Sequence, residues 1–202
     1  MRYIDRLRRT QREEAPLLPV MRPHDWPLFV QCVYRSLLTF QPGVGVPLVA
    51  LGRPRGNGFD MVRRDAVYEL GMSEEDLEIF AVQNLSRIPT ELEVVHRSEA
   101  TERPIILGLP DEGALTASRI LDRDLMLAAH GMLGSHVLFV GMPSLHELYI
   151  CDGSPMADAS LHKAFIVWLQ RHKAKAEGVD PLSDVAFVVR DGEVMGRYIP
   201  PP

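Results

Sequence analysis

The segment VAFVVRDGEVMGRYI, residues 185–199, decides the fold because it has the pattern of a β-hairpin. Val185–Arg190 and Glu193–Ile199 are rich in residues that favour strands, and Asp191-Gly192 lies between them. A two-residue Asp-Gly turn is typical of a type I′ hairpin, in which both turn residues have positive φ. The segment therefore predicts two antiparallel strands at this end of the sequence.

Three more strand pairs are predicted before this hairpin, and helices separate the pairs. The strands are expected at Val46–Leu51 with Gly58–Val62, at Glu91–Arg97 with Pro104–Gly108, and at Val137–Met142 with Glu147–Cys151. The helices are expected from Ser73 to Ile88, from about Ala114 to His130, and from Ser154 through Leu169. Short links between strands indicate hairpins. We therefore predict an α+β fold, a mainly antiparallel sheet of β-hairpins with three main helices packed on it, in the order ββ-α-ββ-α-ββ-α-ββ.

Length and composition predict one globular domain. With 202 residues, of which 46% are hydrophobic and 24% charged, the chain resembles an ordinary folded protein. Residues 1–16 form a predicted Arg-rich helix or arm, and residues 17–202 form a predicted single α+β domain. The net charge of −5 argues against nucleic acid as a partner, because Lys and Arg contacts to phosphates dominate that kind of binding.

The sequence predicts a cytoplasmic protein with no membrane partner. Its amino terminus has no apolar run of signal-peptide length, and no stretch approaches the roughly 20 apolar residues of a membrane span. The two cysteines, Cys32 and Cys151, are far apart in the sequence. In a reducing compartment we expect both to be free thiols.

Two patterns that suggest ligand binding lack the spacing that their chemistry requires. His130, His136 and His146 precede Cys151, but no compact zinc-type spacing joins them, so we expect no metal and no cofactor. The glycine-rich segment Gly52–Gly58 is followed by a predicted strand, whereas a phosphate-binding loop needs a helix there. We interpret it as a basic hairpin turn.

Nucleophilic catalysis remains an alternative hypothesis. A small hydrolase or thiol-dependent enzyme would use Cys151 or Ser135 together with His136 or His146. The Gly-x-Ser-x-Gly pattern of a nucleophile elbow is absent from the sequence. Cys151 also ends an alternating strand, where a cysteine usually acts as a small hydrophobic residue.

Three polar residues fall on helix faces that are expected to be buried. Asn84 lies seven residues after Leu77 on the apolar stripe of the first predicted helix. Ser118 lies on the corresponding stripe of the second, and Arg119 is next to it. Because a buried amide needs hydrogen-bond partners, Asn84 is expected to hold the turn that ends at Pro89. Asn84, Ser118 and Arg119 are the candidate binding residues.

Several short motifs resemble the YtpQ-like family, a bacterial domain of unknown function (number 1444). They are Asn84-Leu-Ser-Arg-Ile-Pro89, Gly113-Ala-Leu-Thr-Ala-Ser-Arg-Ile-Leu121, Pro19-Val-Met-Arg22 and the hairpin segment Pro181–Ile199. The chain departs from the family pattern in having Thr116 where the family has Asp. Members of the family usually carry a further amino-terminal portion, which this sequence lacks. The resemblance implies no enzyme activity, and it groups Asn84, Pro89, Ser118 and Arg119 as residues of interest.

The leading functional hypothesis is a non-catalytic binding or protein-interaction module. Its partner would be an unknown protein or small molecule, and a homodimer formed through an exposed face or edge of the sheet is compatible with it.

Overall fold

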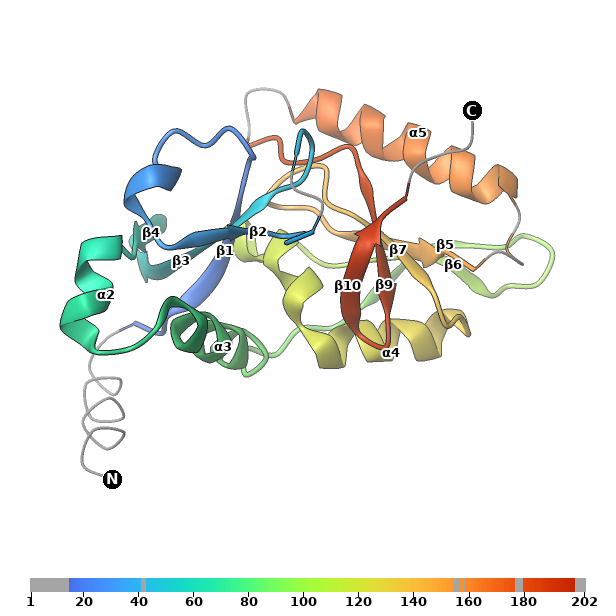
Figure 1. The fold of residues 1–202 in the computed structure, drawn as a ribbon. Coiled ribbons are helices and arrows are strands. Elements are labelled where there is room, and N and C mark those ends of the chain that lie inside the picture. Colours follow the sequence, from blue (N-terminus) through green and yellow to red (C-terminus); the bar gives the residue numbers. More distant parts are fainter. Residues whose placement is uncertain (1–14, 41–42, 155–156, 158, 177–179, 199–202) are drawn as a thin grey trace.

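The structure is a computed structural model that describes residues 15–40, 43–154, 157, 159–176 and 180–198. It confirms the predicted class, an α+β fold with antiparallel sheets (Figure 1). The predicted Arg-rich helix or arm at residues 1–16 lies almost entirely outside the described residues. None of the described helices is long and apolar enough to cross a membrane.

The larger sheet has six antiparallel strands in the order β10-β9-β7-β8-β6-β5. They are β5 (Glu93–Arg97), β6 (Pro104–Gly108), β7 (Leu138–Gly141), β8 (Tyr149–Asp152), β9 (Ala186–Arg190) and β10 (Glu193–Arg197). Asp191 has φ 51° and Gly192 has φ 79°, as a type I′ turn requires. The hairpin predicted from the Asp-Gly pair is therefore confirmed.

One long helix covers each face of this sheet, α4 (Arg123–Leu133) on one side and α5 (Ala159–Lys175) on the other (Figure 1). Side chains of the central strand β7 alternate between them: Leu138 and Val140 join the core under α4, and Phe139 joins the core under α5. Gly141 also faces α5, because a Cβ there would lie 2.2 Å from the Leu169 Cδ2 atom. Because Gly141 has no side chain, α5 can pack close to the sheet at this point.

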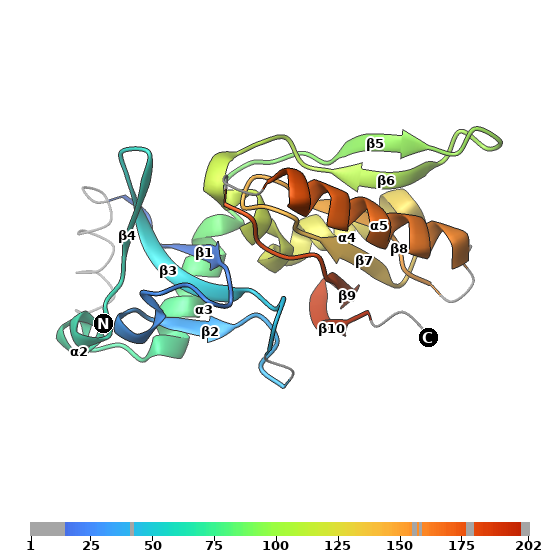
Figure 2. The same cartoon turned by 90° about the horizontal axis from the view of Figure 1, so that it is seen from above.

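A second, smaller sheet lies beside the first (Figure 2). Its strands are β1 (Leu18–Arg22), β2 (Tyr34–Ser36), β3 (Leu48–Arg55) and β4 (Gly58–Met61), and β3 pairs with the other three. The β3–β4 turn confirms the expected hairpin at Gly52–Gly58. The 3₁₀ helix η1 (Phe29–Gln31) and the helices α2 (Arg64–Leu70) and α3 (Glu74–Leu85) belong to this part.

The two sheets share one hydrophobic core. Met21 of β1 and Val49 of β3 belong to the same buried cluster as Val140 and Phe187 of the larger sheet. The buried Ser183 hydroxyl donates a hydrogen bond to the carbonyl of Gly45, 138 residues away in the sequence. This packing holds the small sheet against the large one.

The predicted element order is wrong in the first third of the chain. Strands β1 and β2 and helix α2 were not predicted, because prolines interrupt the first strand region and β2 has only 3 residues. The helix expected over residues 114–130 is also divided. Two 3₁₀ helices, η2 (Gly113–Leu115) and η3 (Ala117–Leu121), precede α4. α4 begins after Asp122, whose extended backbone and side-chain bond from the Leu125 N–H form an N-cap.

The other two predicted helices differ from the structure at one end. Ser73 and Asp76 form a capping box, as the sequence of α3 suggests, but the helix ends at Leu85, before Ile88. The expected start of the third helix at Ser154-Pro155 is wrong by several residues, because α5 begins at Ala159; Pro155 itself lies outside the described residues.

Candidate functional site

The structure brings the candidate residues Asn84, Ser118 and Arg119 to one buried region where β1, α3 and η3 meet. We call this region the joint. The Asn84 amide donates to the Leu17 carbonyl at 3.0 Å, and its oxygen accepts a hydrogen bond from Arg87 at 3.2 Å. The Ser118 hydroxyl accepts a hydrogen bond from the Met21 N–H at 3.2 Å. Asn84 thus has the structural role expected for it in the turn after α3.

Arg119 carries the charge of the joint and has no exposed surface. Its Nη1 donates to the Leu85 carbonyl at 2.9 Å, and Leu85 is the last residue of α3. The last carbonyls of a helix lack partners within the helix, and the Leu85 carbonyl accepts hydrogen bonds from Arg119 and from the Ile88 N–H. Glu112 lies 2.8 Å from Nη2, and Asp122 lies 3.4 Å from Nη1. The guanidinium therefore ties the end of α3 to the start of α4.

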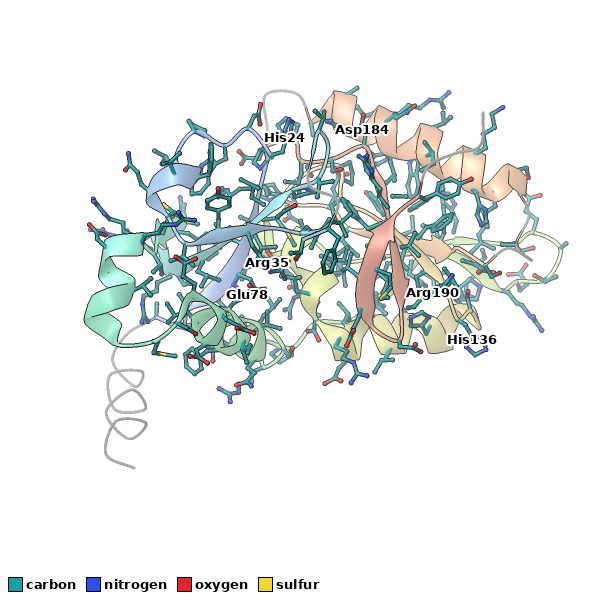
Figure 3. The ribbon with its side chains drawn as sticks, in the orientation of Figure 1. His24, Arg35, Glu78, His136, Asp184 and Arg190 are labelled. Atoms are coloured by element: carbon teal, nitrogen blue, oxygen red, sulfur yellow. The ribbon has the colours of Figure 1, made fainter. Side chains whose placement is uncertain are left out.

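A groove of about 460 Å³ opens next to the joint. Ile120 and Leu121, which directly follow Arg119, line it together with β2, residues 37–40, Val82 of α3 and the β9–β10 hairpin. Arg35 of β2 forms a 2.5 Å ion pair with Glu78 of α3, and Figure 3 shows the two side chains turned toward each other. Since the joint fixes η3 against β1 and α3, it also fixes one wall of the groove.

The rim of the groove has both exposed apolar side chains and unpaired charges. Phe40 is 97% exposed and Met195 is 63% exposed. Arg123 donates to the Asp191 carbonyl at 3.3 Å but forms no ion pair with any described residue. Glu193 likewise has no cationic partner within the described part of the chain. One surface therefore carries the exposed Phe40 side chain, the groove, and a positive and a negative side chain.

Cys151 does not have the features of a reactive thiol. It is completely buried in β8, under α5. Burial raises the pKa of the thiol far above its usual range, and the negative charge of Asp152 raises it further. A nucleophilic cysteine needs the opposite shift, because the thiolate is the reactive form. Cys32 is also buried and free, as expected for both cysteines.

The other proposed catalytic residues are not arranged as a nucleophile and a base. The Ser135 hydroxyl donates to the Val137 carbonyl at 2.6 Å and lies 2.5 Å from the Asp152 carboxylate. His136 is exposed beyond the end of α4 (Figure 3). His146 is hydrogen-bonded to Asp111 at 3.1 Å. Across the described residues, no hydrogen bond joins Ser135 or Cys151 to His136 or His146.

The sequence interpretation missed a polar cluster at the carboxyl end of α5. Its centre is Glu147, 2.8 Å from the His172 Nδ1 atom and 3.0 Å from the Tyr149 hydroxyl. Two patterns in the sequence could have indicated it. Tyr149 and Cys151 lie on one face of β8, and Glu147 continues this alternation in the residues before the strand. His172 continues the α5 stripe that contains Trp168. No group of three His, Cys, Asp or Glu side chains in the described ranges could hold a metal ion.

The chain matches no protein-family model, no curated protein and no solved structure. Resemblance to the YtpQ-like family therefore stays a prediction based on its short motifs.

Proposed function

We propose that this protein is an interaction module that binds a second copy of itself through the groove beside the joint. The observation that carries the proposal is the position of Phe40, whose side chain is 97% exposed at the rim of a hollow. Aromatic residues are enriched in protein interfaces, where they dominate the binding energy. An aromatic side chain this exposed is unfavourable in a monomer, and burying it would stabilise a complex.

The surface has the two complementary halves that a twofold dimer needs. In such an interface the same patch is used by both subunits, so each contact occurs twice. Phe40 of one copy would enter the groove of the other, above Leu121. Arg123 of one copy would pair with Glu193 of the other, and neither has an ionic partner among the described residues of one chain. A second copy therefore supplies both the apolar and the charged partners.

Sedimentation equilibrium of the purified protein tests this proposal. We expect a reversible dimer that weakens as salt is added, since exposed charge pairs are screened. Phe40→Asp should raise the dimer dissociation constant at least about 30-fold, the effect of losing a hot spot worth roughly 2 kcal/mol. Val30→Asp is the matched control, because Val30 is 64% exposed but does not line the groove, and it should leave the constant unchanged.

Charge reversal gives the more specific test. Arg123→Glu alone and Glu193→Arg alone should each weaken the dimer, because each places like charges opposite one another. The double variant restores opposite charges and should recover dimerisation. If the wild-type protein is still monomeric at about 10⁻⁴ M, its dimerisation free energy is weaker than roughly −5.5 kcal/mol. That result would rule out the proposal.

Membership of the YtpQ-like family and a cytoplasmic location belong to the same proposal. The motifs around Asn84 and Ser118-Arg119 support the first, and the free, buried Cys32 and Cys151 support the second. A hydrolase or thiol enzyme that uses Cys151 or Ser135 has less support, because Cys151 is buried and Ser135 is bonded to a carboxylate.

A further inference from the structure

A second hollow, of about 430 Å³, lies at the carboxyl end of α5 and has a different character from the groove. Its walls come from the loop after β6, the turn between β7 and β8, and α5. The lining side chains include Asp111, Ser144, His146, Glu147, His172 and Lys175. We call it the Glu147 hollow. Its volume falls within the range of small-molecule sites, roughly 300–1,000 Å³.

Glu147 holds His172 in one orientation. The Glu147 Oε1 atom lies 2.8 Å from His172 Nδ1, and it also accepts a hydrogen bond from the Tyr149 hydroxyl at 3.0 Å. The other oxygen, Oε2, accepts from the Ser144 hydroxyl at 3.0 Å. An ionised carboxylate at this distance requires the proton on Nδ1, so the neutral ring has its lone pair on Nε2.

Aromatic packing restricts the His172 ring further. Trp168 contacts it edge-on with ring centres 4.9 Å apart, and Tyr149 does so at 5.2 Å. Burial raises the pKa of Tyr149, and the charge of Glu147 and their hydrogen bond raise it further, so the phenol remains a donor to Glu147. His172 retains 21% exposure of its side chain, which leaves it accessible from the hollow.

Two further groups in the hollow can donate protons or stabilise negative charge. His146 pairs with Asp111 at 3.1 Å, so its ring is also held by a carboxylate. The bond from the Gly113 N–H lowers the pKa of Asp111, and the bond to His146 adds to this effect. The Lys175 side chain forms no ion pair or hydrogen bond with another described residue and lies one helical turn after His172. Lys173, by contrast, is paired with Asp184 at 3.2 Å.

We infer that His172 is the general base of a hydrolytic site that takes a small ester in the Glu147 hollow. A base held by a carboxylate, a second imidazole and an ammonium group around one hollow are the components that ester hydrolysis needs. Glu147 is the positioning residue, since it acts through His172. This site is separate from the groove and does not depend on dimerisation.

The reaction begins when His172 Nε2 takes a proton from a water molecule as the water oxygen attacks the acyl carbon. The new carbon–oxygen bond places negative charge on the former carbonyl oxygen, next to Lys175. When this intermediate collapses, the bond to the leaving oxygen breaks. The leaving oxygen takes the proton from the His172 imidazolium, which leaves a carboxylic acid, an alcohol and the regenerated base.

Hydrolysis of 4-nitrophenyl acetate by the full chain tests the inference. We expect His172→Gln to lower kcat/KM at least about 100-fold, the usual contribution of a general base. His24→Gln is the matched control, because His24 is exposed and lies outside the hollow, and it should keep the wild-type rate. Equal rates for the wild type and His172→Gln would overturn the assignment.

The role of Glu147 has its own readout. Glu147→Gln keeps a side chain of the same size but removes the charge that fixes the His172 proton on Nδ1. We expect a lower kcat and a changed pH–rate profile, with the far-ultraviolet circular dichroism of the wild type. An unchanged pH profile would show that Glu147 has no influence on the base. Failure of this assay leaves the groove proposal intact, since sedimentation tests that one independently.

Discussion

The two faces of the six-stranded sheet use buried polar groups in opposite ways. At the end of the α4 face, Arg119 is completely buried and its charge lies against Glu112 and Asp122. At the end of the α5 face, His172 and Glu147 form a similar pair but keep 21% and 27% exposure. Both clusters join a helix to loops. His172 and Glu147 line a hollow that a small molecule could enter, whereas the Arg119 side chain is completely buried.

This difference shows that a polar residue on an apolar helix face can either stabilise the fold or line a hollow open to a ligand. Burial and the location of its partners decide which one applies. The joint stabilises the fold and shapes the groove, whereas the His172–Glu147 pair is partly exposed and lines a hollow. Variants on the two faces should therefore differ in stability far more than their similar chemistry suggests.

Replacing Arg119 should have the largest effect. Arg119→Ala removes the cation that lies against the Glu112 and Asp122 carboxylates, together with one of the donors to the Leu85 carbonyl, so we expect a loss of about 3–5 kcal/mol in unfolding free energy. Urea denaturation measures it. Arg55→Ala is the control, because that arginine pairs with Asp60 while 79% exposed, and it should change stability by less than about 0.5 kcal/mol. Similar losses for both variants would contradict the role of the joint.

Gly141 on the α5 face should give the next largest effect. In Gly141→Ala the new methyl group would lie 2.2 Å from Leu169, which must move α5 or change its rotamer. We expect a loss of about 1–3 kcal/mol by thermal or urea unfolding. Gly131→Ala, inside α4, meets nothing within 4 Å and should instead stabilise the protein by about 0.5–1 kcal/mol. Destabilisation by both variants would contradict this contrast.

High pH should destabilise the α5 face through Cys151. Burial raises the pKa of this thiol in the folded state. The contribution of the thiol to the unfolding free energy is therefore complete below the pKa of the unfolded state and is lost as the pH rises above that pKa. Between pH 8 and 10 we expect the wild type to lose about 1 kcal/mol more unfolding free energy than Cys151→Ala. Cys32→Ala should show a smaller difference, because Arg63 and Arg22 oppose the raised pKa of Cys32. Equal pH slopes for all three proteins would refute the prediction.

The smallest effect on stability is expected for His172→Gln, the variant with the largest predicted effect on ester hydrolysis. The His172–Glu147 pair is partly exposed, and such pairs contribute about 0–1 kcal/mol. Urea unfolding of the variant should therefore almost coincide with that of the wild type. A loss as large as that of Arg119→Ala would show that this cluster is another structural joint.

Most of the larger sheet, and the start of α3, could be predicted from the sequence because the signals are local. The Asp191-Gly192 turn, the alternation in β8 and the capping box of Ser73 each depend on neighbouring residues. The division of the second helix was missed, although Asp122 followed by Asp124 has the pattern of a helix start. β1 could not be recognised, because its strand character depends on pairing with β3 about 30 residues later.

The candidate sites could be predicted only in part. The apolar stripes identified Asn84 and Ser118 as anomalous, but not the distant partners that make their roles structural, such as Leu17 and Met21. Asp111, Glu147 and His172 come from three separate segments, and only the folded sheet places them around one hollow. No local spacing records that proximity.

The hydrogen bond between Ser183 and Gly45 has a consequence for synthesis on the ribosome. At about 5–20 residues per second, the 138 residues between these partners take roughly 7–28 s to make. During that interval β1 and β3 can pair, but the side chains of Met21 and Val49 lack the core that will cover them. The nascent amino-terminal part is then open to aggregation and to chaperone binding.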